Sequence, residues 1–180
     1  MPPTIDVHTR DEHGARLLRT VLDASDPQGT SAVRILTEAA LLQGPALAPR
    51  CLLHEAGLTL DQRIGWASAR ADQALSLHVV SNERWPHACA DPTSGIVGLP
   101  RGVLEAGAQP MRQRLAQLHG MSVRHVIVHA DTDEERMRLV RAAQRCALVS
   151  GPASLLGHLI ARERIAGRMP FAPSPPSLTH

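Results

Sequence analysis

One stretch decides the fold class of this 180-residue chain: Val123-Arg124-His125-Val126-Ile127-Val128-His129-Ala130-Asp131-Thr132-Asp133-Glu134-Glu135. The apolar residues between Val123 and His129 occupy both faces of an extended chain, which is typical of a central strand with both faces covered. Thr132, with Glu135 three residues later and acids in the first turn, predicts the start of a helix. The stretch therefore predicts a strand, a short loop and a helix, the basic unit of an α/β domain.

The first 74 residues predict a helix-rich N-terminal part. We expect a short strand at 5–8 and then a helix over 10–24. Thr30 or Ser31 would cap a second helix through residue 41, and a third would run from Pro45 to a C-cap at Gly57. A fourth begins with the capping-box spacing at Thr59 and continues through residue 74.

Further strands are predicted after residue 74. Residues 75–80 alternate and become β-branched, which predicts a strand, and 95–99 forms a short extended piece. A helix over 103–118 is interrupted or restarted at Pro110. Residues 155–165 fit either a helix or a strand. Together these elements predict a single α/β domain over 1–168, with a central sheet and helices on both faces, and a Pro/Ser-rich disordered tail over 169–180.

Composition restricts the setting of the protein more than its activity. No stretch of eighteen apolar residues occurs, so we expect no membrane span. Three cysteines are too few for a disulfide framework, and we expect a reducing cytoplasm. All 19 basic residues are arginine, which indicates a GC-rich bacterial genome; selection against lysine is the alternative.

Binding to nucleic acid has no support in the sequence. The formal net charge is only +2, the arginines alternate with acids along the chain, and aromatic residues make up 2% of it. Nucleic-acid surfaces need clustered positive charge and usually aromatic platforms for stacking. The sequence identifies no partner, and it is compatible with a homodimer.

Two constellations would suit a metal ion. Asp131 and Asp133 follow the central strand, and two carboxylates at this position would hold Mg²⁺; the alternative is that they simply begin a helix. Zinc would instead need the two pairs Cys51/His54 and His87/Cys89 to meet in space, with the first pair on one side of a helix. Neither motif is complete, so we assign no metal ligands.

The segment from about residue 91 to residue 141 resembles the core of GNAT-type N-acyltransferases and of the related acyl-homoserine-lactone synthases. It has a Gly/Pro-rich loop, a helix, a strand and an acid-capped helix. The resemblance covers less than a third of the chain. The resemblance implies that Gly95, Gly98, Arg101 and Gly102 hold the pyrophosphate of acyl-CoA. The loop departs from the family pattern, because Gly95 stands where an Arg or Gln is usual and Pro100 where a small residue is usual.

Three functions follow from this sequence. The first is an acyl-CoA-dependent acyltransferase in which His129, Asp131 or Asp133 acts as the general base. The chain has no tyrosine to protonate the departing CoA thiolate, as many of these enzymes do. The second is a non-catalytic regulatory, effector or scaffold domain that binds another macromolecule. The third is a metal-dependent enzyme using Zn²⁺ or Mg²⁺.

Overall fold

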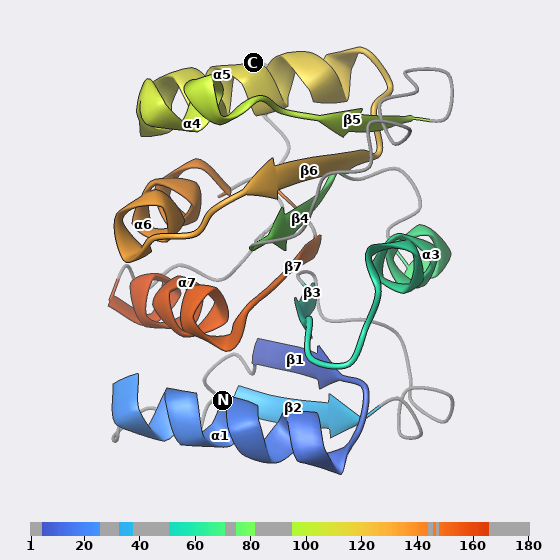
Figure 1. Cartoon of the computed structure of the whole chain (residues 1–180), viewed down its shortest axis with the longest axis vertical. Coiled ribbons are helices and arrows are strands. Elements are labelled where there is room, and N and C mark those ends of the chain that lie inside the picture. The colour runs from blue at the N-terminus through green and yellow to red at the C-terminus, as the bar shows by residue number, and fades with distance from the viewer. Residues whose placement is uncertain are drawn as a thin grey trace, which may run out of the picture.

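The computed structural model describes residues 5–25, 33–37, 51–70, 75–81, 95–143, 146 and 148–165 (Figure 1). Its strands form one seven-stranded sheet in the order β2-β1-β3-β7-β4-β6-β5, and every neighbouring pair is parallel. The strands are β1 (Ile5–Thr9), β2 (Val33–Thr37), β3 (Cys51–His54), β4 (Ser76–Val80), β5 (Ile96–Gly98), β6 (His125–His129) and β7 (Leu148–Gly151).

Helices cover both faces of this sheet. They are α1 (Glu12–Ser25), α3 (Leu60–Arg70), α4 (Arg101–Glu105), α5 (Ala108–Gly120), α6 (Asp133–Ala142) and α7 (Ala153–Ile165). Helices α1, α7, α6 and α5 contact one another in a row along one face, whereas α3 lies on the opposite face (Figure 1). The predicted α/β class is therefore confirmed. None of the described helices combines the length and apolar character that a membrane crossing needs.

The apolar core lies between the sheet and the row of helices. Each strand directs alternate side chains to this side, including Leu52, Leu77 and Val126, all with 0% exposure. Leu18 of α1 and Leu139 of α6 complete the same buried cluster. Because this is the larger of the two apolar clusters, burial of α1, α6 and α7 supplies the main hydrophobic stabilisation of the fold.

Two predicted helices are wrong. The second was expected to contain Val33 and Leu36, but residues 33–37 form strand β2; the third was expected to contain Cys51 and His54, but residues 51–54 form strand β3. All four residues of β3 are buried. Short strands buried on both faces carry no clear period of two, so apolar spacing alone cannot separate them from a helix.

The structure also places the elements that the sequence left uncertain. Residues 155–165 lie in helix α7. The helix expected over 103–118 is two helices, and the break falls at Gly107, where φ is +113°, while Pro110 lies in the first turn of α5. Proline is tolerated in a first turn, because the N–H that it lacks would have no helical acceptor there. The predicted tail over 169–180 lies outside the described residues.

The carboxyl ends of all seven parallel strands meet at one edge of the sheet. From β1 the chain passes through α1 to β2, and from β3 it passes through α3, on the other face, to β4. The two connections leave neighbouring strands in opposite directions, which makes the β1/β3 junction a topological switch point. Open α/β sheets bind ligands along this edge.

Candidate functional site

Three side chains predicted from the sequence meet at the carboxyl edge of β5 and β6. Gly98 of β5 pairs with Ile127 of β6, so the segments that leave these two strands lie side by side. Arg101, the first residue of α4, places its Nη2 2.7 Å from Oδ2 of Asp131 and 3.5 Å from Nδ1 of His129. The Arg101 side chain is 57% exposed and that of Asp131 is 27% exposed, so the cluster faces solvent.

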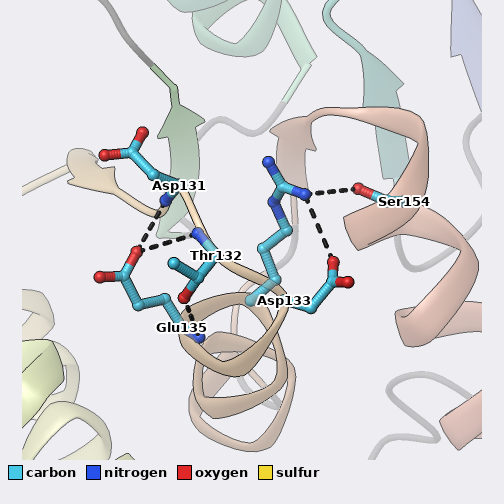
Figure 2. A network of polar contacts seen from close by, with 6 residues as sticks. Asp131, Thr132, Asp133, Glu135 and Ser154 are labelled. Carbon is cyan, nitrogen blue, oxygen red and sulfur yellow. Dashed lines mark hydrogen bonds and ion pairs between the residues drawn. The ribbon is translucent and has the colours of Figure 1, made fainter.

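A capping box fixes the position of Asp131 (Figure 2). Glu135 Oε2 accepts hydrogen bonds from the backbone N–H of Asp131 at 2.7 Å and of Thr132 at 3.3 Å. The backbone N–H of Glu135 in turn donates to Thr132 Oγ1 at 3.2 Å. The predicted cap of α6 is confirmed, and it holds the Asp131 backbone beside the end of β6.

The two carboxylates of the predicted Mg²⁺ pair have different partners. Asp131 contacts Arg101, whereas Asp133 lies 3.5 Å from Nη1 of Arg136, which also donates to Ser154 Oγ at 3.1 Å. Figure 2 shows the two carboxylates on separate sides of the loop. Among the described residues, no group of three His, Cys, Asp or Glu side chains is arranged to hold a metal ion.

The zinc prediction fails at its first pair. Cys51 and His54 lie on a strand and not on a helix, and residues three apart on a strand point to opposite faces. Cys51 packs with Ala67 on the α3 side, and His54 Nδ1 approaches Gly14 at the start of α1. His87 and Cys89 lie outside the described residues.

The predicted phosphate loop is divided between the two ends of β5. Gly95 precedes the strand, at φ +74°, and its carbonyl accepts from the backbone N–H groups of Arg124 and His125. Gly98 and Arg101 lie at the other end, and Gly102 is inside α4. Three strand residues span about 10 Å. Gly95 is therefore not in the loop of the other three residues, which stay together at the carboxyl edge.

The β1/β3 switch point is filled by its own side chains. Thr9 Oγ1 and His54 Nδ1 are buried and have no hydrogen-bond partner within the described part of the chain. Both point at the first turn of α1, where a Cβ on Gly14 would lie 2.4 Å from Thr9 Oγ1. Burial lowers the pKa of His54, and the nearby Gly14 backbone opposes that shift. His54 is thus a neutral side chain of the α1–sheet junction.

A second polar cluster, which the sequence reasoning missed, lies between the sheet and α3. His78 of β4, His125 of β6 and Ser150 of β7 are buried there, together with Arg63 of α3 at 2% exposure. His78 Nδ1 lies 2.6 Å from Ser150 Oγ, and its Nε2 lies 3.2 Å from His125 Nδ1. Arg63 Nη1 donates to Ser150 Oγ at 3.2 Å and to the Val79 carbonyl at 2.9 Å.

Both histidines of this cluster are neutral near pH 7. Burial, followed by the repulsion that a protonated His78 would meet from a protonated His125 and from Arg63, places the pKa of His78 well below its ordinary value. Burial and then Arg124 lower the pKa of His125. One sequence signal for this cluster existed, because Ser76 and His78 occupy alternate positions of the otherwise apolar β4, and Ser150 follows two apolar residues in β7.

Comparison with known proteins adds no relative to these observations. No protein-family model, no curated protein and no solved structure matches the chain. Function is therefore argued from the two clusters themselves.

Proposed function

We propose that this protein is a group-transfer enzyme that binds an anionic cosubstrate beside Arg101, and that the cosubstrate is acyl-CoA. The observation that carries the proposal is the meeting of Arg101, His129 and Asp131 at the carboxyl edge of the sheet. These residues come from two separate segments, and this edge is where parallel α/β sheets bind their ligands.

Arg101 is suited to contact a phosphate. Its contacts with Asp131 and His129 both use Nη2, and the remaining N–H donors of a guanidinium belong to Nε and Nη1. A planar guanidinium binds phosphate oxygens through two parallel hydrogen bonds. Asp131 would orient the Arg101 side chain, since its own backbone is held by the cap of α6.

His129 is the proposed general base. It lies at the end of β6, half-buried and next to Arg101. In acyl transfer from a thioester, the base removes a proton from the acceptor as the acceptor attacks the carbonyl carbon. The C–S bond then breaks, and the CoA thiolate leaves and takes up a proton. Asp133 has no part in this proposal, because its side chain is 81% exposed and lies beside Arg136.

Native mass spectrometry with acetyl-CoA, followed by calorimetry, tests the binding step. We expect one CoA per chain, with affinity lowered about tenfold or more in Arg101→Ala, because a charge-assisted hydrogen bond contributes about 1.5–3 kcal/mol. The matched control is Arg114→Ala, which removes an arginine whose side chain contacts Gln117 on α5. Absence of binding by the unaltered protein, or equal losses in both variants, would contradict the proposal.

Release of free thiol from acetyl-CoA, with a set of small primary amines supplied as acyl acceptors, tests the chemical step. His129→Gln should keep CoA affinity and lose thiol release, since it removes the base and leaves Arg101 in place. CoA binding without thiol release in the unaltered protein would instead favour a non-catalytic, ligand-sensing domain.

A further inference from the structure

The two faces of the sheet are covered in different ways. The face under α1, α6 and α7 is apolar, but the face under α3 carries buried polar side chains on several strands: Asp6, His8, Ser76, His78, His125 and Ser150. The apolar contact beneath α3 consists of Cys51, Ala67 and Leu148, with Trp66 packed against them. Helix α3 is therefore attached to the sheet by hydrogen bonds as well as by apolar contact.

These hydrogen bonds form a closed loop that begins and ends on α3. Arg63 Nη1 contacts Ser150 Oγ, which lies 2.6 Å from His78 Nδ1. His78 Nε2 lies 3.2 Å from His125 Nδ1, and His125 Nε2 lies 3.0 Å from Ser68 Oγ. The loop thus runs from α3 through β7, β4 and β6 and returns to α3 five residues further along.

The order of donors in this loop is determined by its ends. Ser68 Oγ donates to the Ile64 carbonyl at 2.8 Å, so it must accept from His125 Nε2–H. A neutral His125 then accepts at Nδ1 from His78 Nε2–H, and His78 accepts at Nδ1 from the Ser150 hydroxyl. Ser150 Oγ accepts from Arg63. Every imidazole nitrogen has a partner, and both rings carry their proton on Nε2.

An added proton has no place in this arrangement. A proton on Nδ1 of His125 would face the Nε2–H of His78, so two donors would meet at 3.2 Å. Moving the His78 proton to Nδ1 would transfer the conflict to the Ser150 hydroxyl, which would lose its acceptor. Proton uptake by either ring therefore either sets two N–H groups against each other or leaves the buried Ser150 hydroxyl without an acceptor, and it places a cation near Arg63.

The surrounding charges also oppose a cation at either histidine. From α3 the facing charge is Arg63, and Arg124 precedes β6. The carboxylate of Glu55 lies 3.7 Å from Arg63 Nη1, so it contacts the arginine of the loop and not its histidines. Three titratable side chains lie on the same face of β3 and β1: Cys51, His8 and Asp6. The ring of His8 lies 4.9 Å from that of Trp66. Asp6 is paired with Arg34. Burial and these cations keep both histidines neutral by lowering their pKa values.

We propose that the Arg63–Ser150–His78–His125–Ser68 loop is an acid-sensitive latch, which holds α3 on the sheet when its histidines are neutral and releases α3 when either takes up a proton. Release leaves the apolar core on the other face intact, because α1, α6 and α7 do not contribute to the loop. It uncovers the sheet face beneath Trp66 and separates Arg63 from the carboxyl edge at Val79.

Hydrogen exchange of the α3 and α7 amides, corrected for the pH dependence of intrinsic exchange, tests the latch. Protection of α3 should be lower than that of α7 and should fall about tenfold or more between about pH 7.5 and about pH 5, since each histidine whose pKa rises to its ordinary value on opening contributes up to tenfold per pH unit. His125→Gln removes one of the two titrating groups and leaves His78, so its α3 should be less protected at neutral pH and should lose about half of the pH response on a logarithmic scale. The control, His119→Gln, changes an exposed histidine on α5 and should behave as the unaltered protein.

Two outcomes would overturn the latch. One is protection of the α3 amides that does not fall between about pH 7.5 and about pH 5 in the unaltered protein; the other is an unchanged pH response in His125→Gln. If His125→Gln fails to fold, an NMR titration of the unaltered protein replaces it. Imidazole resonances of His78 and His125 that titrate near pH 6.5 while α3 stays protected would equally exclude the latch.

Discussion

Replacing Gly14 with alanine should destabilise the protein, although the same substitution at Gly65 should stabilise it. Both glycines lie in helices, where alanine is favoured over glycine by up to about 1 kcal/mol. The surroundings differ. A Cβ at Gly65 would have nothing within 4 Å, whereas a Cβ at Gly14 would lie 2.4 Å from Thr9 Oγ1 and 3.7 Å from His54 Nδ1.

The clash at Gly14 decides the sign of the effect. Thr9 is 1% exposed, and its β-branched side chain has few alternative rotamers on a buried strand. Overpacking of this kind costs about 1–3 kcal/mol, and we take the upper part of that range because the contact is so short. After the gain in helix propensity, Gly14→Ala should lower the free energy of unfolding by about 2 kcal/mol. Gly65→Ala should raise it by about 0.5–1 kcal/mol.

Urea and thermal unfolding followed by circular dichroism measure both values. For a chain of this length, 1 kcal/mol corresponds to a shift in Tm of about 2–4 °C. We therefore expect a decrease of about 4–8 °C for Gly14→Ala and an increase of about 1–4 °C for Gly65→Ala. A double-mutant cycle with Thr9→Ala identifies the cause, because removing Oγ1 should return at least half of the loss. Stabilisation by Gly14→Ala, or strict additivity with Thr9→Ala, would refute the proposed packing at the β1/β3 junction.

Three further predictions concern stability. Arg63→Ala should lower the free energy of unfolding, measured by urea titration, by about 2–4 kcal/mol. Arg63→Met should lower it by about half as much, because methionine refills the volume and the carboxylate of Glu55, which loses its partner, stays partly hydrated. Thr132→Ala should cost about 1 kcal/mol and Thr132→Ser under about 0.5 kcal/mol in the same assay, because serine keeps the capping oxygen. Stability should also decrease with acid. His78 has a lowered pKa in the folded state, so the unfolded chain takes up its proton first, and each such histidine removes up to about 1.4 kcal/mol per pH unit below pH 6.5. A stability that stays constant between about pH 7 and about pH 5 would contradict this last prediction.

Local sequence signals predicted the elements that local chemistry determines. The spacing from Thr132 to Glu135 gives the capping box of α6, and the apolar run before it gives β6. The same reasoning failed at β2 and β3, which have four or five residues each. Val33 and Leu36 fit a helical spacing and a strand equally well, so the pairing of these segments with β1 decides between them. That pairing joins segments far apart in the chain, so no local sequence pattern indicates it.

The candidate site was predicted in part for the same reason. Asp131 was singled out because it follows a predicted strand, and Arg101 because the resemblance implied a phosphate loop there. The two residues meet because they follow neighbouring parallel strands. Gly95 was misplaced because the bounds of β5 were not known. The latch residues are spread from position 63 to position 150 and belong to four elements, so only the strand order brings them together. Polar residues within otherwise apolar strands would have been the signal to follow.

The polar face also accounts for how α3 keeps its position. An apolar interface tolerates sliding, because any apolar side chain contacts any other with nearly the same energy. A hydrogen-bonded loop does not, because a shift of α3 by one turn would leave Arg63 and Ser68 without Ser150 and His125 and would leave buried donors unsatisfied. The loop therefore fixes the register of α3 on the sheet. The same dependence on the order of donors and acceptors makes the loop sensitive to acid. One extra proton, like a shift of the helix, leaves a buried donor without an acceptor.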